Sequence, residues 1–229
     1  PLHQRLQLRK LGHNTPCLEA EVSERIGLVN ESVETYADRQ KRRRSEARRN
    51  TEALRRGAAD AEVLFHLAGG VRGHGRITPD QLNAVGTRSL LEAIRGLNNL
   101  KSFVYASSCA VYGDRSSLWV EEDFTVSPNT RYGLSKIEAE NACVEAMERS
   151  GLPLKIARIA AVYGPDFPFA MAEPIRSGKA WLPGEGRNCI PLIHIDDCIR
   201  ALWVIAENAE TGSIVHVADR SSPTLAEFY

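Results

Sequence analysis

The sequence predicts an α/β fold in which helices cover both faces of a parallel sheet. From residue 57 onward, short apolar segments alternate with longer amphipathic ones. Such an alternation of strands and helices is typical of parallel sheets. The chain has 229 residues, of which 43% are hydrophobic and 25% charged. This length and composition are those of one globular domain, or of one domain with a small appendage.

The predicted elements follow one another in a regular order. Strands are expected at residues 61–69, 101–108, 154–164 and 212–219, helices at 78–96 and 129–151, and a strand that runs into a helix at 190–208. Thr78 and Pro79 mark the start of the first helix, and Gly151 marks the end of the second. Ligands in such sheets bind beyond the carboxyl ends of the strands, so the residues that follow each strand are the candidate site.

Residues 1–56 form an atypical basic N-terminal segment. Between Arg39 and Arg56, nine Lys or Arg residues stand against two Glu. No aromatic residues lie between these charges, so a solvated helix or a poorly ordered segment is favoured over a nucleic-acid-binding arm. We expect the folded core to begin near residue 57.

Net charge, the length of apolar runs and cysteine spacing indicate which kinds of partner and compartment to expect. The 29 basic and 29 acidic residues cancel, so no nucleic-acid partner is expected. No membrane partner is expected either, because the apolar runs are too short to span a bilayer and no signal peptide opens the chain. The five cysteines are far apart, at positions 17, 109, 143, 189 and 198. This spacing favours free thiols in the cytoplasm over disulfides or a metal site.

A tyrosine and a lysine provide the candidate chemistry. Tyr132 and Lys136 are four residues apart on a predicted helix, so they share one face. A tyrosine with an ordinary pKa near 10 is a poor base, and a nearby ammonium is expected to lower that pKa. Ser108, at the end of the preceding strand, can hold a substrate oxygen. The alternative interpretation is an amphipathic helix in which Tyr132 packs and Lys136 reaches solvent.

Seven segments carry a resemblance to a known family. They are, in order, FHLAG, LNAVGT, ASSCAVYG, YGLSK, ARIAAVYGP, LPGEG and LIHIDD. Across about residues 57–229 the chain resembles the extended short-chain dehydrogenases/reductases, which include the NAD-dependent epimerases and dehydratases. The resemblance implies a Rossmann-like doubly wound parallel sheet and part of a small substrate-binding region at about residues 165–190.

The resemblance also implies roles for individual residues and a cofactor, NAD or NADP. Ser108, Tyr132 and Lys136 match catalytic positions. The matching cofactor-binding residues are Leu67, Ala68, Gly69, Asn83, Ser107, Tyr132, Lys136 and Ala160. The substrate, a small molecule, is expected to contact Ser108, Tyr132, Gly184 and Arg187.

A homodimer is expected from the same resemblance. It would form through the helices around residues 79–95 and 130–149. Small side chains on the second helix, at Ala139, Ala142, Cys143 and Ala146, would permit close approach.

The sequence departs from the family pattern in several places. Only Gly12, Gly27 and Gly57 precede Gly69, so the TGxxGxxG turn that holds the cofactor diphosphate is missing. The run AGGVRGHG at 68–75 is interpreted as a loop rather than a substitute for that turn. The chain also ends at Tyr229, earlier than the family pattern, so a truncated C-terminus is expected.

Further departures bear on the reaction and on the substrate. Cys109 and Ala110 stand where sugar dehydratases carry Asp and Glu, which argues against 4,6-dehydration. Cys109 is interpreted as a packed thiol. Ile190 replaces an arginine that meets the diphosphate of nucleotide sugars, which weakens the nucleotide-sugar interpretation.

Two hypotheses for function follow. The first is an NAD(P)-dependent epimerase or reductase acting on a secondary alcohol or ketone, possibly of a sugar nucleotide. The second is a non-catalytic or truncated family remnant that binds a nucleotide or partner weakly. His194 is expected to be structural, and Asp196 and Asp197 are expected to cap a helix rather than bind metal.

Overall fold

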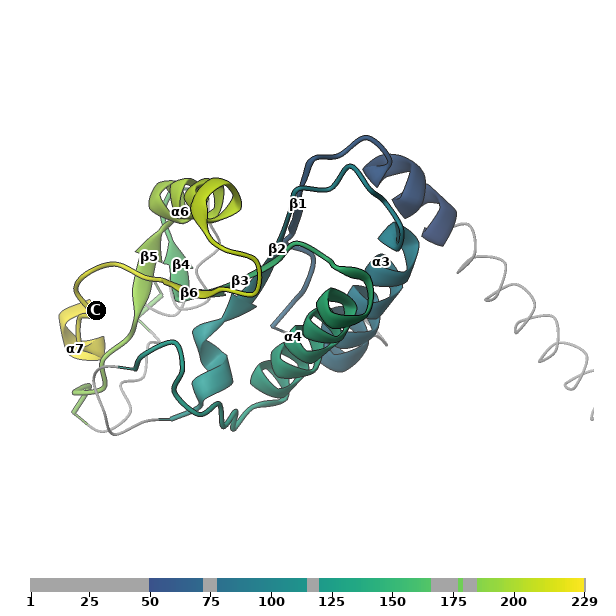
Figure 1. Cartoon of the computed structure of the whole chain (residues 1–229). Coiled ribbons are helices and arrows are strands. Elements are labelled where there is room, and N and C mark those ends of the chain that lie inside the picture. Colours follow the sequence, from purple (N-terminus) through teal and green to yellow (C-terminus); the bar gives the residue numbers. More distant parts are fainter. Residues whose placement is uncertain (1–49, 72–77, 115–119, 166–176, 179–184, 229) are drawn as a thin grey trace, which may run out of the picture. The chain divides into compact units, whose positions relative to one another are not determined.

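The computed structural model describes residues 50–71, 78–114, 120–165, 177–178 and 185–228 (Figure 1). Residues 51–229 form one compact unit. Residues 50–58, at the end of the basic N-terminal segment, are helical, while the rest of that segment lies outside the described residues. Most of the expected substrate region at 165–190 also lies outside them.

Four parallel strands make the main sheet, in the order β1-β2-β3-β6. They are β1 (Val63–His66), β2 (Ser102–Ser108), β3 (Leu154–Ile159) and β6 (Ile214–Val217). Six of the seven residues of β2 are buried, as expected for a central strand covered on both faces. The predicted parallel sheet is confirmed.

The predicted strand at 154–164 is two strands. β3 ends at Ile159, and β4 (Ala161–Tyr163) pairs in parallel with β5 (Leu192–His194) in a separate two-stranded sheet. The backbone changes partner at Ala160, whose N–H donates to the carbonyl of Val217 (2.9 Å), whereas the N–H of Ala161 donates to that of Pro191 (3.0 Å). A switch of partner between adjacent residues leaves no trace in apolar periodicity.

The helices lie mainly where the sequence predicts them. They are the π-helical turn η1 (Gln81–Val85), α3 (Gly86–Ile94), the 3₁₀ turn η2 (Cys109–Tyr112), α4 (Arg131–Ser150), α6 (Ile195–Asn208) and α7 (Leu225–Phe228). Thr78 and Gln81 exchange hydrogen bonds as a capping box. Gly151 ends α4 in the left-handed conformation, at φ 68°.

The cap of α6 differs from the expectation. The side chain that accepts a hydrogen bond at its start is that of His194, from the N–H of Asp196 at 3.3 Å. Asp196 and Asp197 lie in the first turn instead, and Asp197 pairs with Arg200. The helix thus begins directly after β5, one residue before the aspartates. His194 therefore has a structural role as the cap of α6.

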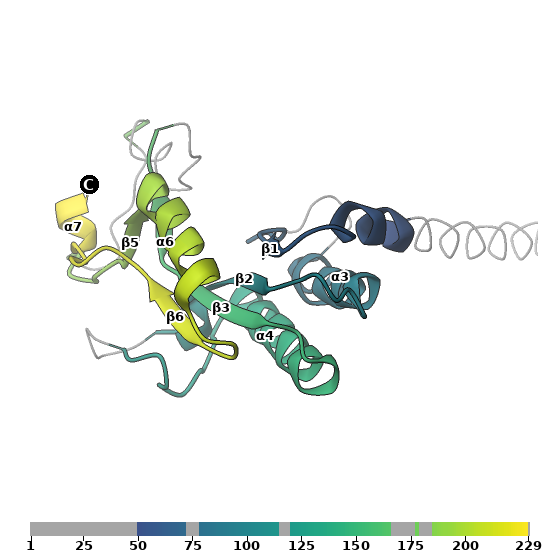
Figure 2. The same ribbon diagram turned by 45° about the horizontal axis from the view of Figure 1, so that its top comes forward.

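Alternate residues of β2 face two separate apolar clusters. Phe103 and Tyr105 pack with residues of α3 and α4, whereas Val104 packs with Cys198 and Leu202 of α6. Helices α3 and α4 therefore cover one face of the sheet and α6 the other (Figure 2). This arrangement confirms the doubly wound fold, and it places the carboxyl end of β2 beside the start of α4.

Candidate active site

The three predicted catalytic residues come from two adjacent elements. Ser108 is the last residue of β2, and Tyr132 and Lys136 lie in the first two turns of α4. The Thr130 hydroxyl caps α4 by accepting from the N–H of Gly133 at 3.0 Å. A Cβ at Gly133 would lie only 2.5 Å from the Ala110 carbonyl oxygen, so glycine is needed there for α4 to approach η2. This close contact brings the start of α4 to the end of β2.

Lys136 is buried at the end of β2. Its ammonium donates to the carbonyl oxygen of Ala106 at 2.8 Å and lies 5.1 Å from the ring centroid of Tyr105 and 5.8 Å from that of Tyr132. Burial lowers the pKa of Lys136 to about 8, while Glu140 and Cys143 act to raise it. Lys136 is therefore held against the sheet and does not reach into solvent.

The pKa of Tyr132 is opposite to the sequence-based expectation. Burial raises the pKa of Tyr132 above its ordinary value, and a side-chain hydrogen bond with Ser108 acts to lower it. Lys136 is not among the groups that shift it. The expectation that the nearby ammonium lowers the pKa of Tyr132 was wrong, because removal of the phenol from water disfavours the phenolate.

The loop after β1 is joined to α4 through Asn83. The amide of Asn83 donates to the Gly70 carbonyl (3.0 Å) and to the Ser135 hydroxyl (2.9 Å), and its oxygen accepts from the N–H of Gly70 (2.8 Å). A Cβ at Gly69 would lie 2.7 Å from the Asn83 oxygen and 3.2 Å from the Lys136 ammonium. The structure thus brings Gly69, Asn83 and Lys136 together.

The other predicted residues divide into three groups. Leu67 and Ala68 are exposed at the end of β1, and Ala160 is buried at the end of β3. Arg187 is exposed and pairs with Glu185. Among the described residues, it makes no contact with Tyr132. Gly184 lies outside the described residues.

Ser107 has a partner that the sequence did not reveal. Its hydroxyl donates to Glu140 of α4, which also forms a buried ion pair with Arg158 of β3 at 2.9 Å. The sequence carries a weak signal, since Glu140 is one helical turn beyond Lys136, but only the fold shows that Arg158 faces it.

His66 is a second residue missed from the sequence. It is buried at the end of β1 beside Tyr105, and its Nε2 lies 2.8 Å from the Thr87 hydroxyl. The Thr87 hydroxyl donates to the Asn83 carbonyl (2.6 Å), so Nε2 of His66 is the donor in the first contact. Burial and the Lys136 charge lower the pKa of His66 to about 4.

Within the described part of the chain, no group of three or more His, Cys, Asp and Glu side chains could hold a metal ion. No described helix is long and apolar enough to cross a membrane.

The residues present fit the nicotinamide-ribose end of a dinucleotide. The exposed loop Leu67–Gly69 has an open approach to its backbone, and Gly69 leaves the space above Asn83 and Lys136 that a Cβ would fill. A buried ammonium beside that space is a suitable donor to ribose hydroxyls.

A parallel α/β sheet with Ser, Tyr and Lys at the carboxyl end of a central strand has the features of the short-chain dehydrogenases/reductases. A model of the NAD dependent epimerase/dehydratase family matches residues 17–218. The chain belongs to this family, which confirms the resemblance. The match begins before residue 57, within the segment 1–56.

Curated relatives match between about three fifths and two thirds of the chain. An uncharacterized UDP-glucose epimerase of Bacillus subtilis (strain 168) is 30% identical over 155 residues, which are 63% of this chain and 48% of that protein. D-erythronate dehydrogenase of Cupriavidus necator is 28% identical over 163 residues, 69% of this chain and 49% of that protein. The chain thus spans about half the length of the curated relatives it matches.

A solved structure has a similar fold. UDP-glucuronic acid 4-epimerase from Bacillus cereus, in complex with UDP-glucuronic acid and NAD, superposes with a TM-score of 0.66 at 27% identity. The similarity covers 76% of this chain and 59% of that one.

Proposed function

We propose that the protein is an NAD-dependent epimerase or reductase acting on a secondary alcohol or ketone of a sugar nucleotide. The observation that carries the proposal is the placement of Ser108, Tyr132 and Lys136 around one point at the carboxyl end of β2. A proton acceptor, a hydroxyl that holds the substrate oxygen and a buried ammonium are the groups needed to oxidise an alcohol.

The mechanism assigns one task to each group. NAD, when bound, supplies the acceptor and donor of hydride. Tyr132 Oη takes the proton of the substrate hydroxyl, and the Ser108 hydroxyl holds the same substrate oxygen. Lys136, whose ammonium lies 5.8 Å from the centroid of the Tyr132 ring, would donate to the ribose hydroxyls. The same groups would serve an epimerase, in which the oxidised carbon is reduced again from its other face, or a reductase, in which Tyr132 gives a proton to the carbonyl oxygen.

The relatives support the cofactor and the substrate class. UDP-glucuronic acid 4-epimerase and MoeE5, at 27% identity each, are solved with NAD and with UDP-glucuronic acid or UDP-glucose. Cys109 and Ala110, at the end of β2, provide no carboxylate for elimination, which favours epimerisation or reduction over dehydration. Arg187, exposed and paired with the exposed Glu185, is the candidate contact for a substrate phosphate, together with Gly184.

The non-catalytic alternative is not favoured. A remnant would have no need for Lys136, buried without an ion-pair partner in the described residues, or for Gly69 packed against Asn83. Burial of an ammonium costs free energy. A ligand-binding role for Lys136 would explain why the chain carries this cost.

The test is titration of the full chain with NAD in a calorimeter, alongside turnover of UDP-glucuronic acid and UDP-glucose followed by NMR of the sugar. We expect NAD to bind and a 4-epimer or a keto sugar to form. Lys136→Met should weaken NAD binding, whereas Lys101→Met, which removes an exposed lysine paired with Glu62, should not. Absence of NAD binding by the wild-type chain would overturn the proposal.

We also propose a homodimer through the outer faces of α3 and α4. Ala139, Ala142 and Cys143 do not support it as expected, because all three are buried in the cluster that contains Phe103. Support comes from Leu134, 49% exposed near the start of α4. Light scattering at roughly tens of micromolar should give twice the chain mass, and Leu134→Lys should give a monomer.

We place the protein in the cytoplasm. The cysteines among the described residues, Cys109, Cys143, Cys189 and Cys198, are free thiols, which are typical of a reducing compartment. Fractionation of the source cells should find it there.

A further inference from the structure

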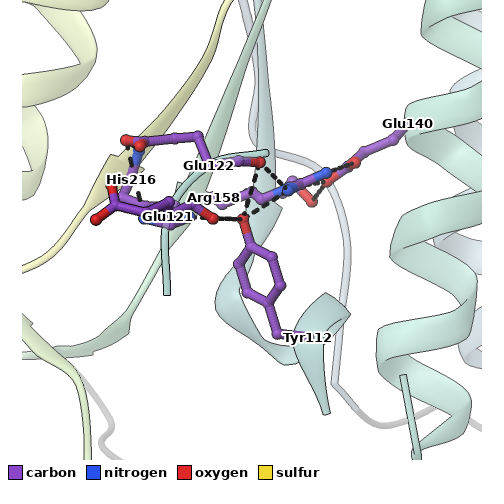
Figure 3. Close-up of polar contacts among 7 residues, drawn as sticks. Tyr112, Glu121, Glu122, Glu140, Arg158 and His216 are labelled. Carbon is purple, nitrogen blue, oxygen red and sulfur yellow. Dashed lines mark hydrogen bonds and ion pairs between the residues drawn. The ribbon is translucent and has the colours of Figure 1, made fainter. Parts of the chain in front are cut away.

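A buried polar network joins α4 to three strands and a loop behind the catalytic residues (Figure 3). Its centre is the ion pair between Glu140 and Arg158, whose side chains are each 5% exposed. Arg158 contacts both carboxylate oxygens of Glu140, through Nε at 3.2 Å and NH2 at 2.9 Å, and Ser107 donates to one of them. Such a bidentate pair is geometrically specific.

The far side of Arg158 is also fully engaged. Its NH1 donates to the Tyr112 hydroxyl at 2.6 Å and to the Glu122 carbonyl at 3.1 Å. The Tyr112 hydroxyl lies 2.6 Å from Nε2 of His216 in β6. Figure 3 shows Arg158 between Glu140 on one side and Tyr112, Glu122 and His216 on the other. The guanidinium therefore cannot move away from Glu140 without breaking several hydrogen bonds.

Lys136 is the buried charge nearest to this network along α4. It lies one helical turn before Glu140, and no carboxylate of the described residues is within ion-pair distance of its ammonium. A buried ammonium with one backbone acceptor would lose its proton readily. An anion in a poorly screened interior acts over more than contact distance, and Glu140 is such an anion.

We propose that Glu140 is a positioning residue of the active site: fixed by Arg158 and Ser107, it keeps buried Lys136 in its charged form beside Tyr132. This proposal rests on the proposed function for the use of Lys136. The carboxylate is placed by β2 and β3, so the strand that carries Ser108 also helps to set the charge of the lysine on α4.

The other titratable groups around Lys136 raise its pKa less than Glu140 does, or do not raise it. They are Tyr132 and Cys143 on α4, Tyr105 on β2 and His66 on β1. Burial raises the pKa of Tyr105, Tyr132 and Cys143 and lowers that of His66, so all four are neutral at neutral pH. Glu140 is then the anion that offsets the burial of Lys136.

The experiment is an NMR titration of the full chain labelled with ¹³C at lysine Cε, in which the Lys136 signal is assigned by its loss in Lys136→Met. In Glu140→Gln we expect the midpoint of Lys136 to fall by about 1 pH unit, as for loss of an opposite charge nearby. The matched control is Glu138→Gln, the same change at an exposed position on α4, where the midpoint should stay.

A second pair of variants keeps the test decisive if Glu140→Gln does not fold, since an unpaired buried guanidinium is costly. Arg158 is not among the groups that shift Lys136. Arg158→Met should therefore leave the Lys136 midpoint at or above the wild-type value. Adding Glu140→Gln to it, which removes the carboxylate that Arg158→Met leaves unpaired, should lower the midpoint.

The Lys136 titration tests this proposal independently of the proposed function, because it needs neither NAD nor turnover. An equal Lys136 midpoint in Arg158→Met with and without Glu140→Gln would overturn the positioning role. If the chain turns over, Glu140→Gln should lower kcat at neutral pH more than it raises KM for the sugar nucleotide. A rise in KM alone would also contradict the role.

Discussion

The side-chain amide of Asn83 donates a hydrogen bond to the hydroxyl of Ser135 at 2.9 Å, and both side chains are buried. This contact joins η1 to α4. Because Asn83 also exchanges two hydrogen bonds with Gly70, one amide holds the loop after β1 against the helix that carries Tyr132 and Lys136.

Asn83→Ala is therefore expected to destabilise the fold as well as the site. The substitution leaves two backbone groups of Gly70 and the hydroxyl of Ser135 without this partner, at a cost of about 2–4 kcal/mol. Urea denaturation measures it. Ser135→Ala, the matched variant, removes one of the three contacts and should cost about 1 kcal/mol. Equal losses for the two variants would contradict the bridging role.

Gly69→Ala should weaken NAD binding. The new Cβ would lie 2.7 Å from the Asn83 oxygen, which is fixed by Gly70, and 3.2 Å from the Lys136 ammonium. We expect a loss of stability of about 1–3 kcal/mol and a weaker calorimetric signal with NAD. Gly57→Ala is the control, because nothing lies within 4 Å of its Cβ and it sits in a helix. It should stabilise by about 0.5 kcal/mol, and unchanged NAD affinity in Gly69→Ala would count against the site.

The sequence predicts the fold well where local signals and burial coincide. β2 is apolar along its length because both faces are covered, and Thr78, Thr130 and Gly151 act on the backbone within their own turns. Ser108, Tyr132 and Lys136 could be proposed from local spacing, because one ends a strand and the other two are an i, i+4 pair. Their approach to one another depends on the contact of Gly133 with Ala110, which the sequence does not reveal.

What the sequence does not reveal depends on contacts between distant segments. Glu140 and Arg158 each look like an ordinary surface charge until β3 is aligned beside β2, with Arg158 opposite Ser107. The raised pKa of Tyr132 depends on how much water the fold excludes, which spacing cannot give. The small residues Ala139 and Cys143 were assigned to a dimer because their inward direction was unknown.

Acid should destabilise the protein through His66. Its folded pKa is about 4, below the ordinary 6.5, so between these values the unfolded chain binds the extra proton. The stability is complete above pH 6.5 and is lost as pH falls toward 4, by about 3 kcal/mol in all. Urea midpoints across this range should fall in wild type and fall less in His66→Gln, which keeps a donor to Thr87.

The His66→Gln variant should still lose part of its stability in acid, because of His216. Burial lowers its pKa as well, so it changes stability in the same direction. The same pH slope in wild type and His66→Gln would show that His66 is not the buried neutral group described here.

Tyr132→Phe should abolish turnover and leave the fold intact, because it removes the proton acceptor and almost no volume. Burial raises the pKa of Tyr132, so the rate should increase with pH toward the alkaline side, where the phenolate forms. Ser108→Ala should lower kcat by roughly 10² to 10³, as for loss of one positioning donor. Steady-state rates with UDP-glucuronic acid and NAD provide the measurement.

Cys109→Ala is the matched control for Ser108→Ala, one residue further along the chain. Burial raises the pKa of Cys109 to about 11, and its thiol donates to the Arg158 carbonyl at 3.4 Å. A neutral, packed thiol keeps its proton near neutral pH, so kcat should stay close to that of wild type. Full activity in Tyr132→Phe, or a loss in Cys109→Ala as large as in Ser108→Ala, would show that the proton moves through another group.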